Sequence, residues 1–335
     1  MRYLVTGATG FIGKKLALKL IDLNHEVVAV VRDPAKARDL EEAGITIFQG
    51  DITDKYSLRK PMSGCEGVFH VAGWYKVGVK DKSQAAAVNV EGSRAIFEMM
   101  RETGVVKGVY TSTLAINSDT HGKELDETFR FTGKHLSEYD RTKALAHHVA
   151  EEYIERGLPL TIVQPGMVYG PGDGGPAHNI WKGYLRRTLT TVPKRVAYSW
   201  GYVDDIVDGH ILAMQQGEVG ESYIICGPSA TLVNALKTAE QYTGIKMPSQ
   251  TSPGILKLMS SIMGIVESIA SVPENYSSEY LRVAAGVTYL GDNAKARKEF
   301  GYNPRPLKAG IPPTLDWEMA QLGMVPRKAA SAAPI

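Results

Sequence analysis

The stretch "YLVTGATGFIGKKLA", from Tyr3 to Ala17, decides the fold of this chain. An apolar, strand-like run leads directly into three glycines, Gly7, Gly10 and Gly13, and the third lies inside the start of a helical pattern. In such a turn the first glycine permits a tight bend, the second lets the backbone approach a pyrophosphate, and the third allows close packing of helix on strand. The free N–H groups at the helix N-terminus attract the anion. The sequence therefore predicts a dinucleotide-binding turn near residue 10.

The first half of the chain alternates short apolar runs with amphipathic stretches, which is typical of βαβ units around a parallel sheet. The expected strands are Tyr3–Thr6, Val27–Arg32, Thr46–Gln49, Val68–Val71, Val109–Ser112 and Leu160–Gln164. The expected helices include Ile12–Leu23, Asn89–Thr103 and Tyr139–Arg156. We therefore predict an α/β fold of the Rossmann type, a doubly wound parallel sheet with helices on both faces.

The regular alternation weakens after Gly170, where the segment "GPGDGGP" (170–176) indicates a loop. We predict a Rossmann dinucleotide-binding domain in residues 1–170. Residues 171–325, which include the strand-like "SYIIC", are expected to form mainly a smaller substrate-binding lobe with returns to the sheet. The small and polar residues 326–335 are expected to be a disordered tail.

The composition is that of an ordinary globular protein, with 335 residues, of which 44% are hydrophobic and 22% charged. The formal net charge is only +2 and the chain contains no basic run, which argues against nucleic acid as a partner. Cys65 and Cys226 are too few for a disulfide framework or a metal site, and this usage fits a reducing cytoplasm. Because strand-like residues begin at position 2, we expect no targeting segment and a cytoplasmic protein.

One apolar stretch, Gly254 to Val272, needs an interpretation of its own. Its apolar residues fall at 255, 258, 259, 262, 265, 266 and 269, which is a helical stripe. Lys257 and Glu267 interrupt it, so it lacks the apolar length of a membrane span. We expect a helix that is buried or covers a pocket, with membrane-surface contact as the second interpretation.

The glycine spacing in "TGATGFIG" (6–13), G-x-x-G-x-x-G, resembles that of the short-chain dehydrogenase/reductase superfamily. The similarity is to its extended branch, the NAD(P)-dependent epimerase/dehydratase family with its dihydroflavonol-4-reductase-like members. It extends well over about residues 1–210 and loosely over the remainder. The resemblance implies an NAD(P)-dependent oxidoreductase whose phosphate-binding turn consists of Gly7, Thr9, Gly10, Phe11, Ile12 and Gly13.

The end of the second strand indicates which nicotinamide cofactor binds. An acidic residue there would accept hydrogen bonds from the adenosine ribose and repel a 2′-phosphate. This chain has Arg32 at that position, with Lys36 and Arg38 nearby, and a guanidinium suits a phosphate bidentately. We therefore favour NADP, and Asp33, which follows directly, keeps NAD open.

Three further stretches match the branch in order and register, and the resemblance implies cofactor contacts for each. The pair in "GDITD" would flank the adenine ring, "FHVAG" (69–73) would leave space for the adenosine ribose, and "QPGMVYGPGD" (164–173) would meet the nicotinamide carboxamide. The residues implied are Asp51, Ile52, Val71, Ala72, Gly73, Pro165, Gly166, Met167 and Val168.

Carbonyl reduction needs a hydride from the nicotinamide and a proton donor at the substrate oxygen. A tyrosine can donate that proton if a nearby cation lowers its pKa, and a lysine four residues later lies on the same helix face. Tyr139 and Lys143 open a long helical pattern behind the strand end that carries Ser112 and Thr113. We predict Thr113, Tyr139 and Lys143 as the catalytic residues, with Tyr139 and Lys143 also contacting the cofactor.

Two other tyrosines are followed by a lysine at the same spacing. Tyr56 and Lys60 follow the adenine-side "GDITD", so we expect surface residues there. Tyr242 and Lys246 are separated by Gly244 at an expected helix end, where a common helix face is lost. These two pairs are therefore interpreted as chance matches.

The likeness leaves three functions open. The 4,6-dehydratases of the superfamily carry Asp-Glu after the catalytic threonine, where this chain has Leu114 and Ala115. The Met- and Ile-rich helix expected at 255–269 and the aromatic residues Trp74 and Tyr75 favour an apolar pocket. We predict an NADP(H)-dependent reductase of a small ketone or aldehyde. A nucleotide-sugar epimerase is the alternative, and a non-catalytic dinucleotide-binding scaffold stays open.

Two expectations follow from the family alone. Asn89 in "VNVEGS" would organise the following helix and a water relay, or simply pack that helix. The family commonly forms homodimers, here through the helices expected at Asn89–Thr103 and Tyr139–Arg156.

Overall fold

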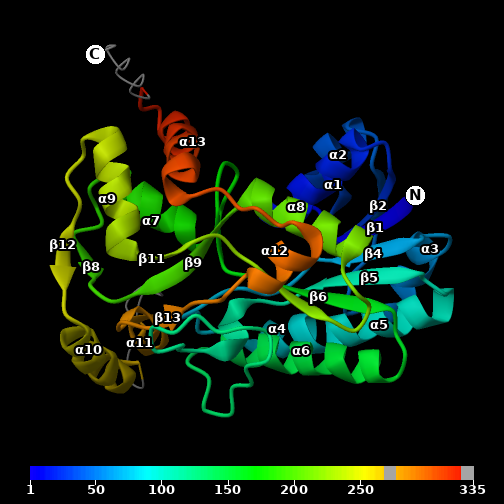
Figure 1. The fold of residues 1–335 in the computed structure, drawn as a ribbon, viewed down its shortest axis with the longest axis horizontal. Helices are drawn as coiled ribbons and strands as arrows, with labels where there is room; N and C mark the ends of the chain where they lie inside the picture. Colours follow the sequence, from blue (N-terminus) through cyan, green and yellow to red (C-terminus); the bar gives the residue numbers. More distant parts are fainter. Residues whose placement is uncertain (268–276, 326–335) are drawn as a thin grey trace.

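The fold is that of a computed structural model, which describes residues 1–267 and 277–325 (Figure 1). The disordered tail expected at 326–335 lies outside the described residues, as do residues 268–272 of the apolar stretch. The statements below concern the described part of the chain.

A parallel sheet of seven strands forms the centre of the molecule, in the order β10-β6-β5-β4-β1-β2-β3. Its strands are β1 (Arg2–Thr6), β2 (Glu26–Val31), β3 (Thr46–Gln49), β4 (Gly67–His70), β5 (Lys107–Thr111), β6 (Leu160–Pro165) and β10 (Ser222–Ile225). The chain moves outward from β1 to β3 and then returns to β4 on the other side of β1. This reversal is that of a doubly wound Rossmann sheet, so the predicted fold is confirmed.

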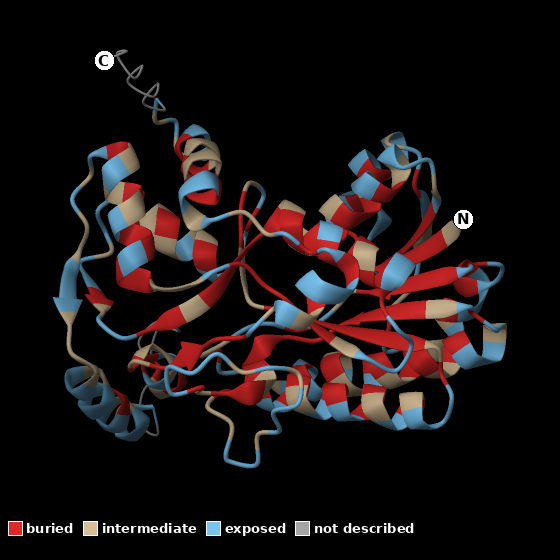
Figure 2. Ribbon diagram, viewed as in Figure 1, coloured by how far each residue is buried: buried red, intermediate tan, exposed pale blue. Residues whose placement is uncertain are grey.

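Each strand sends alternate side chains into two separate cores, because successive residues of a strand point to opposite faces. In β1, Val5 belongs to one core and Leu4 to the other. The first core contains residues of α1 (Phe11–Asp22), α2 (Arg38–Glu42), α8 (Val203–Gln216) and α12 (Ala294–Phe300). The second contains residues of α3 (Arg59–Met62), α5 (Gly92–Thr103) and α6 (Glu138–Glu155). Figure 2 shows the resulting buried sheet between two helical layers.

The helix expected at Asn89–Thr103 begins earlier than predicted. The chain enters it through α4 (Ser83–Ala86) and a wider turn, η3 (Ala87–Glu91), which places Asn89 in a π-helical segment. Shorter 3₁₀ turns lie at η1 (Pro34–Ala37), η2 (Lys55–Leu58) and η4 (Leu114–Asn117).

Most of the chain after β6 forms a second part of the molecule. This part has its own hydrophobic core, which contains the buried Trp181 and Trp200. Its strands are β7 (Met167–Tyr169), β8 (Thr191–Pro193), β9 (Ala197–Tyr202), β11 (Ser229–Thr231), β12 (Ser249–Thr251) and β13 (Thr288–Tyr289). Its helices are α7 (Pro176–Leu185), α9 (Leu232–Thr243), α10 (Pro253–Val266), α11 (Ser278–Ala284) and α13 (Leu307–Gln321). Because β10 and α8 return to the central sheet, the chain crosses between the parts more than once, and the boundary at residue 170 stays a prediction.

The apolar stretch from residue 254 is helical as predicted, but the expectation that it is buried or covers a pocket is wrong for the part described. In α10, Leu258 is 63% and Ile262 51% exposed, and the one fully buried residue of the helix is Ser260, whose hydroxyl donates to Ser278 O. The helix lies at an outer end of the molecule and packs against α11 (Figure 1). None of the described helices is long and apolar enough to cross a bilayer.

Candidate cofactor and catalytic site

The glycine-rich turn lies at the carboxyl end of β1, beside the end of β4. Gly7 has a φ of +72°, and a Cβ there would lie 2.8 Å from Ala72 N, so both the backbone conformation and the space require glycine. A Cβ at Gly13 would lie 2.2 Å from Gly7 O, which confirms that this glycine lets α1 approach the turn. Thr9 and Gly10 are exposed at this edge of the sheet, as a phosphate-binding turn requires.

The ends of β1 and β4 are joined by side-chain hydrogen bonds. Val71 N and Ala72 N both donate to Thr6 Oγ1 at 3.2 Å, and a Cβ at Gly73 would lie 3.3 Å from Asn89 Oδ1. Phe11, at the start of α1, lies against the loop that contains Gly172. Together with the half-buried Ile12, these residues lie at the carboxyl ends of β1 and β4, where the phosphate and ribose region of the cofactor is expected.

Arg32 is exposed directly after β2, and Lys36 follows it on the same surface. The Asp33 carboxylate accepts from Ala35 N at 3.1 Å and so caps η1, and Lys36 Nζ lies 4.0 Å from it. The Asp33 carboxylate therefore caps the turn in which it lies, while the Arg32 guanidinium is exposed to solvent.

The adenine-side pair points in two directions. Asp51 Oδ1 accepts from both the N–H and the hydroxyl of Thr53 at 2.9 Å, whereas Ile52 is buried against Gly92. One side chain thus offers an acceptor and the other an apolar surface.

The stretch Pro165 to Val168 connects the central sheet to the second part of the chain. Pro165 ends β6, and Met167 and Val168 pair with Trp200 and Gly201 in β9. A Cβ at Gly166 would lie 2.0 Å from Ser199 O, so this close approach also depends on glycine.

Helix α6 brings Tyr139 and Lys143 to the end of β5, one helical turn apart. Ser137 caps the helix by accepting from Asp140 N at 3.1 Å, and an N-cap serine fixes the start of such a helix. Lys143 Nζ donates to Tyr110 OH at 3.0 Å and to Thr111 O at 2.8 Å. Burial lowers the pKa of Lys143 to about 7, because a buried ammonium is poorly solvated.

Tyr139 lies beside Thr113, so these two predicted residues are neighbours. Burial raises the pKa of Tyr139 to about 12, and the nearby Thr113 hydroxyl acts in the opposite direction. The expected net lowering of this pKa by the lysine is therefore absent from the described structure, where the Lys143 ammonium is directed at Tyr110 and Thr111. Thr113 also caps η4 by accepting from Ala115 N at 3.2 Å.

The two competing tyrosine–lysine pairs lie in other surroundings. Tyr56 is 81% exposed, in agreement with the expected surface position. Tyr242 OH donates to Asp316 Oδ1 at 2.6 Å, and α9 ends at Gly244 in the left-handed conformation. The helix therefore stops before Lys246, as predicted.

Asn89 packs its helix against two neighbours. Its side chain accepts from Trp74 N at 2.7 Å and donates to Trp74 O and to Thr142 Oγ1. With both amide donors and the oxygen engaged, the packing interpretation agrees with the geometry.

Two residues near this site carry no motif and could not be found from the sequence. Glu279 of α11 is buried, accepts from Gly78 N and from Glu138 N, and pairs with Lys82, so it joins the second part of the chain to the start of α6. Tyr110 is buried in β5, and the sequence indicates only that it belongs to an apolar strand. A long-range contact of this kind leaves no local signal in the sequence.

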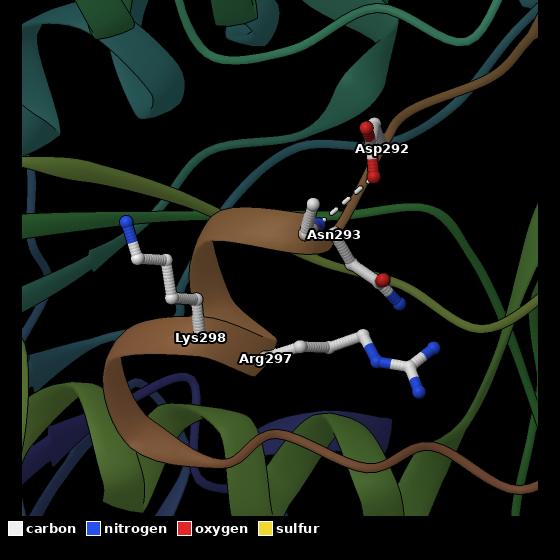
Figure 3. A pocket seen from close by; sticks show the side chains of 5 residues that line it. Asp292, Asn293, Arg297 and Lys298 are labelled. Atoms are coloured by element: carbon white, nitrogen blue, oxygen red, sulfur yellow. Dashed lines mark hydrogen bonds between the residues drawn. The ribbon is translucent and has the colours of Figure 1, made fainter.

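Two surface hollows lie away from these residues. One is lined by Asp292, Asn293, Ala294, Arg297 and Lys298, where Asp292 accepts from Ala294 N at 2.9 Å at the start of α12 (Figure 3). The side chains of Arg297 and Lys298 extend in different directions from the helix (Figure 3). The other lies beside the edge strand β10, and five of its thirteen lining residues are glutamates, including Glu151 and Glu221. Neither contains a residue of the predicted site among its described lining.

The Rossmann sheet, the glycine turn and the family resemblance define the class, an NAD(P)-dependent enzyme of the short-chain dehydrogenase/reductase type. Residues 3–226 match the NAD dependent epimerase/dehydratase family. The chain belongs to this family.

Two relatives match two thirds of the chain or more, and one of them is a dihydroflavonol 4-reductase. The chain is 28% identical over 341 residues to sterol demethylase protein B of Methylococcus capsulatus, covering 97% of this chain and 100% of the relative. It is 29% identical over 256 residues to dihydroflavonol 4-reductase of Hordeum vulgare, covering 68% of this chain and 71% of that enzyme. The predicted branch is confirmed.

Solved structures confirm the fold. The structure of gox2253 has a TM-score of 0.83 at 27% identity and covers 96% of this chain and 99% of its own. A UDP-glucuronic acid 4-epimerase mutant of Bacillus cereus, solved with a substrate analogue and NAD, has a TM-score of 0.76 at 21% identity, with 96% and 100% covered.

Proposed function

We propose that this protein is an NADP(H)-dependent reductase of a small apolar ketone or aldehyde, with Thr113, Tyr139 and Lys143 as its catalytic residues. The observation that carries the proposal is the position of Tyr139, which lies beside Thr113 and one turn before the buried Lys143. The bound nicotinamide would supply the hydride. Tyr139 would donate the proton to the carbonyl oxygen, and Thr113 would hold that oxygen.

Lys143 would act on both partners of this reaction. Two of its three N–H groups donate to Tyr110 OH and Thr111 O, which leaves one for a ribose hydroxyl of the cofactor. Its positive charge one turn from Tyr139 would stabilise the phenolate that remains after proton transfer.

The surroundings of Tyr139 support an apolar substrate. Its ring packs between two small apolar clusters, one from the segment after β4 and one formed largely by the second part of the chain. The members of these clusters are Trp74, Val79, Ala85 and Val88, and Ala115, Leu136, Tyr198, Val283, Val287 and Tyr289. The sequence-based argument for an apolar pocket also used Tyr75, which is 59% exposed, and the helix expected at 255–269, whose apolar residues are mostly exposed in α10. Of its three parts, only Trp74, which is buried, supports the pocket here. The names of the relatives, sterol demethylase protein B and dihydroflavonol 4-reductase, agree with a substrate that contains several carbon-based rings.

The choice of NADP over NAD rests on Arg32. Its guanidinium is exposed at the strand end, where the 2′-phosphate of the adenosine ribose would lie, and Asp33 is engaged by its own turn. The turn suits the phosphates of the cofactor, because Thr9 and Gly10 are exposed at the start of α1, while Gly7 and Gly13 permit the close internal packing that shapes the turn.

A homodimer and a cytoplasmic location belong to the same proposal. Leu145 of α6 is 40% exposed, which supports an interface over α5 and α6. Both cysteines, Cys65 and Cys226, are buried and unpaired, which agrees with a reducing compartment.

The test is Tyr139→Phe, assayed by NADPH consumption with a panel of apolar ketones and aldehydes. We expect turnover to fall by about 10²- to 10⁴-fold, the usual contribution of a positioned proton donor, while NADPH binding is retained. Tyr56→Phe, the same change in an exposed chance pair, is the matched control and should leave the rate unchanged.

The other functions predict different outcomes of the same assay. A nucleotide-sugar epimerase would convert its substrate without net consumption of NADPH. A dinucleotide-binding scaffold would bind NADPH but would convert none of the compounds in the panel. Unchanged turnover in Tyr139→Phe would refute the proposed site.

A further inference from the structure

A chain of buried polar side chains runs from the glycine-rich turn to Lys143. Thr6 Oγ1 lies 2.8 Å from His70 Nδ1, and His70 Nε2 lies 3.0 Å from Ser93 Oγ. Ser93 lies beside the hydroxyl of Tyr110, and that hydroxyl lies 3.0 Å from Lys143 Nζ. All five residues are at most 5% exposed, so these bonds form out of contact with water.

The direction of each bond in this chain follows from the partners at its two ends. Thr6 Oγ1 already accepts from two backbone N–H groups, so its own proton goes to His70 Nδ1. Burial lowers the pKa of His70 to about 3, so the ring is neutral and carries its single proton on Nε2, which donates to Ser93.

The remaining two bonds are determined in the same way. The Ser93 hydroxyl donates to Asn89 O at 2.6 Å, because a carbonyl oxygen only accepts. Because its proton is committed to Asn89, Ser93 Oγ can act toward the neighbouring Tyr110 hydroxyl only as an acceptor. The oxygen of Tyr110 accepts from Lys143. The chain therefore presents an acceptor, fixed in direction, to the ammonium group.

The ring of Tyr110 is held as firmly as its hydroxyl. It stacks on His70 at a centroid distance of 5.5 Å and an interplanar angle of 26°, and Phe97 meets it edge-on at 5.5 Å. Lys143 Nζ lies 4.7 Å from the centroid of the same ring. A tyrosine packed in this way cannot follow a lysine that moves, so it defines where the lysine can form its bond.

We propose that Tyr110 is a positioning residue, whose hydroxyl, oriented by Ser93 and His70, holds the Lys143 ammonium in place for the reaction. This inference rests on the proposed role of Lys143 beside Tyr139. Without the hydroxyl, the two acceptors observed for Lys143 would be reduced to one, Thr111 O.

A lost acceptor has a measurable consequence, because hydrogen bonds to an ionised group stabilise its charged form. The titratable groups that face Lys143 include Tyr110 on β5, Tyr139 on its own helix and His70 on β4, which is neutral over the working range. Removal of the Tyr110 hydroxyl should make the ammonium harder to maintain and less well placed.

The experiment is Tyr110→Phe in the full chain, with the titration of Lys143 followed by NMR of protein labelled with [ε-¹³C]lysine. The Lys143 signal is identified as the one missing from Lys143→Arg. We expect the measured pKa of Lys143 to fall by about one unit, and turnover to fall about tenfold, with the alkaline limb of the rate profile shifted to lower pH. A folded variant is verified by its thermal unfolding transition.

The matched control is Tyr153→Phe. Tyr153 is also a buried tyrosine, lies on the same helix as Lys143 and loses a single hydroxyl bond, to Glu98 at 3.1 Å. It should change the unfolding temperature without moving the Lys143 signal.

A second variant guards against a Tyr110→Phe protein that fails to fold. Ser93→Ala removes the group that orients the Tyr110 hydroxyl and should shift the titration of Lys143 in the same direction by a smaller amount. An unchanged titration in the folded variants would overturn the inference. The NMR measurement does not depend on turnover. An active Tyr139→Phe enzyme would therefore refute the proposed function, whereas the inference on Tyr110 is tested by the titration of Lys143 alone.

Discussion

Helices α1 and α10 carry the same kind of pattern and end in opposite surroundings. Both show apolar residues at helical spacing, and for both the sequence predicts that this stripe is covered. In α1 the stripe is buried in the first core, with Leu16 at 0% exposed. In α10 the corresponding residues face outward, with Leu258 at 63% exposed. A hydrophobic stripe indicates a helix and its apolar face, but says nothing of what that face meets.

The difference lies in what surrounds each helix along the chain. Helix α1 connects two parallel neighbours, β1 and β2, and such a crossover must place its helix on the face of that sheet. Helix α10 follows the short strand β12, which pairs only with β8 in a two-stranded sheet. No strand on either side of α10 within the described residues constrains its position.

The first prediction tests this contrast directly through the free energy of unfolding. Leu16→Ala should destabilise the protein by about 2–5 kcal/mol, because it opens a cavity in a closely packed core. Leu258→Ala, the same change on the exposed stripe, should stay within about 0.5 kcal/mol of the parent protein. Chemical denaturation of both variants measures the difference. A comparable loss in Leu258→Ala would mean that the stripe of α10 is covered in solution.

The same contrast explains how far the sequence could predict the site. Gly7, Gly13, Tyr139 and Thr113 follow strand ends of a regular sheet, so their positions were inferred from the order of elements. Tyr110 could not be inferred, because its role depends on which way one residue of a buried strand points and on what the opposite helix places there.

Residues contributed by the second part of the chain were also beyond prediction. Glu279 reaches the start of α6 across 141 positions of sequence, and no periodicity indicates such a contact. Tyr289 likewise donates to Asp140 Oδ2 at 3.1 Å, beside the predicted catalytic tyrosine. The part of the proposed site that would meet the substrate depends on contacts of this long-range kind, which is why the sequence indicates the reaction more readily than the substrate.

The second prediction uses a glycine from each of the two helices. Gly13→Ala places a Cβ 2.2 Å from Gly7 O, so the turn must shift, at a cost of roughly 1–3 kcal/mol in the free energy of unfolding, and NADPH binding should be lost. Gly254→Ala in the first turn of α10 meets nothing within 4 Å and should be neutral or slightly stabilising. Fluorescence titration with NADPH and thermal unfolding distinguish the two. If Gly13→Ala retained its affinity for NADPH, the close packing of α1 on the turn would not be required for cofactor binding, and the prediction would be wrong.

The last prediction concerns a smaller effect, the preference between the two nicotinamide cofactors. Arg32 directly follows β2, the strand to which α1 returns the chain, so its backbone position is constrained by the sheet. Lys257 is an exposed cation on α10. Arg32→Ser should weaken NADPH binding about tenfold, the value of one charge-assisted hydrogen bond, and leave NADH binding unchanged. Lys257→Ser removes the same charge from the surface and should change neither affinity. Because both substitutions alter the net charge equally, a selective loss in Arg32→Ser can come only from a local contact with the 2′-phosphate. Equal losses of NADPH affinity in the two variants would mean that only general electrostatic attraction is at work. This result would contradict the proposal that Arg32 determines the preference for NADP.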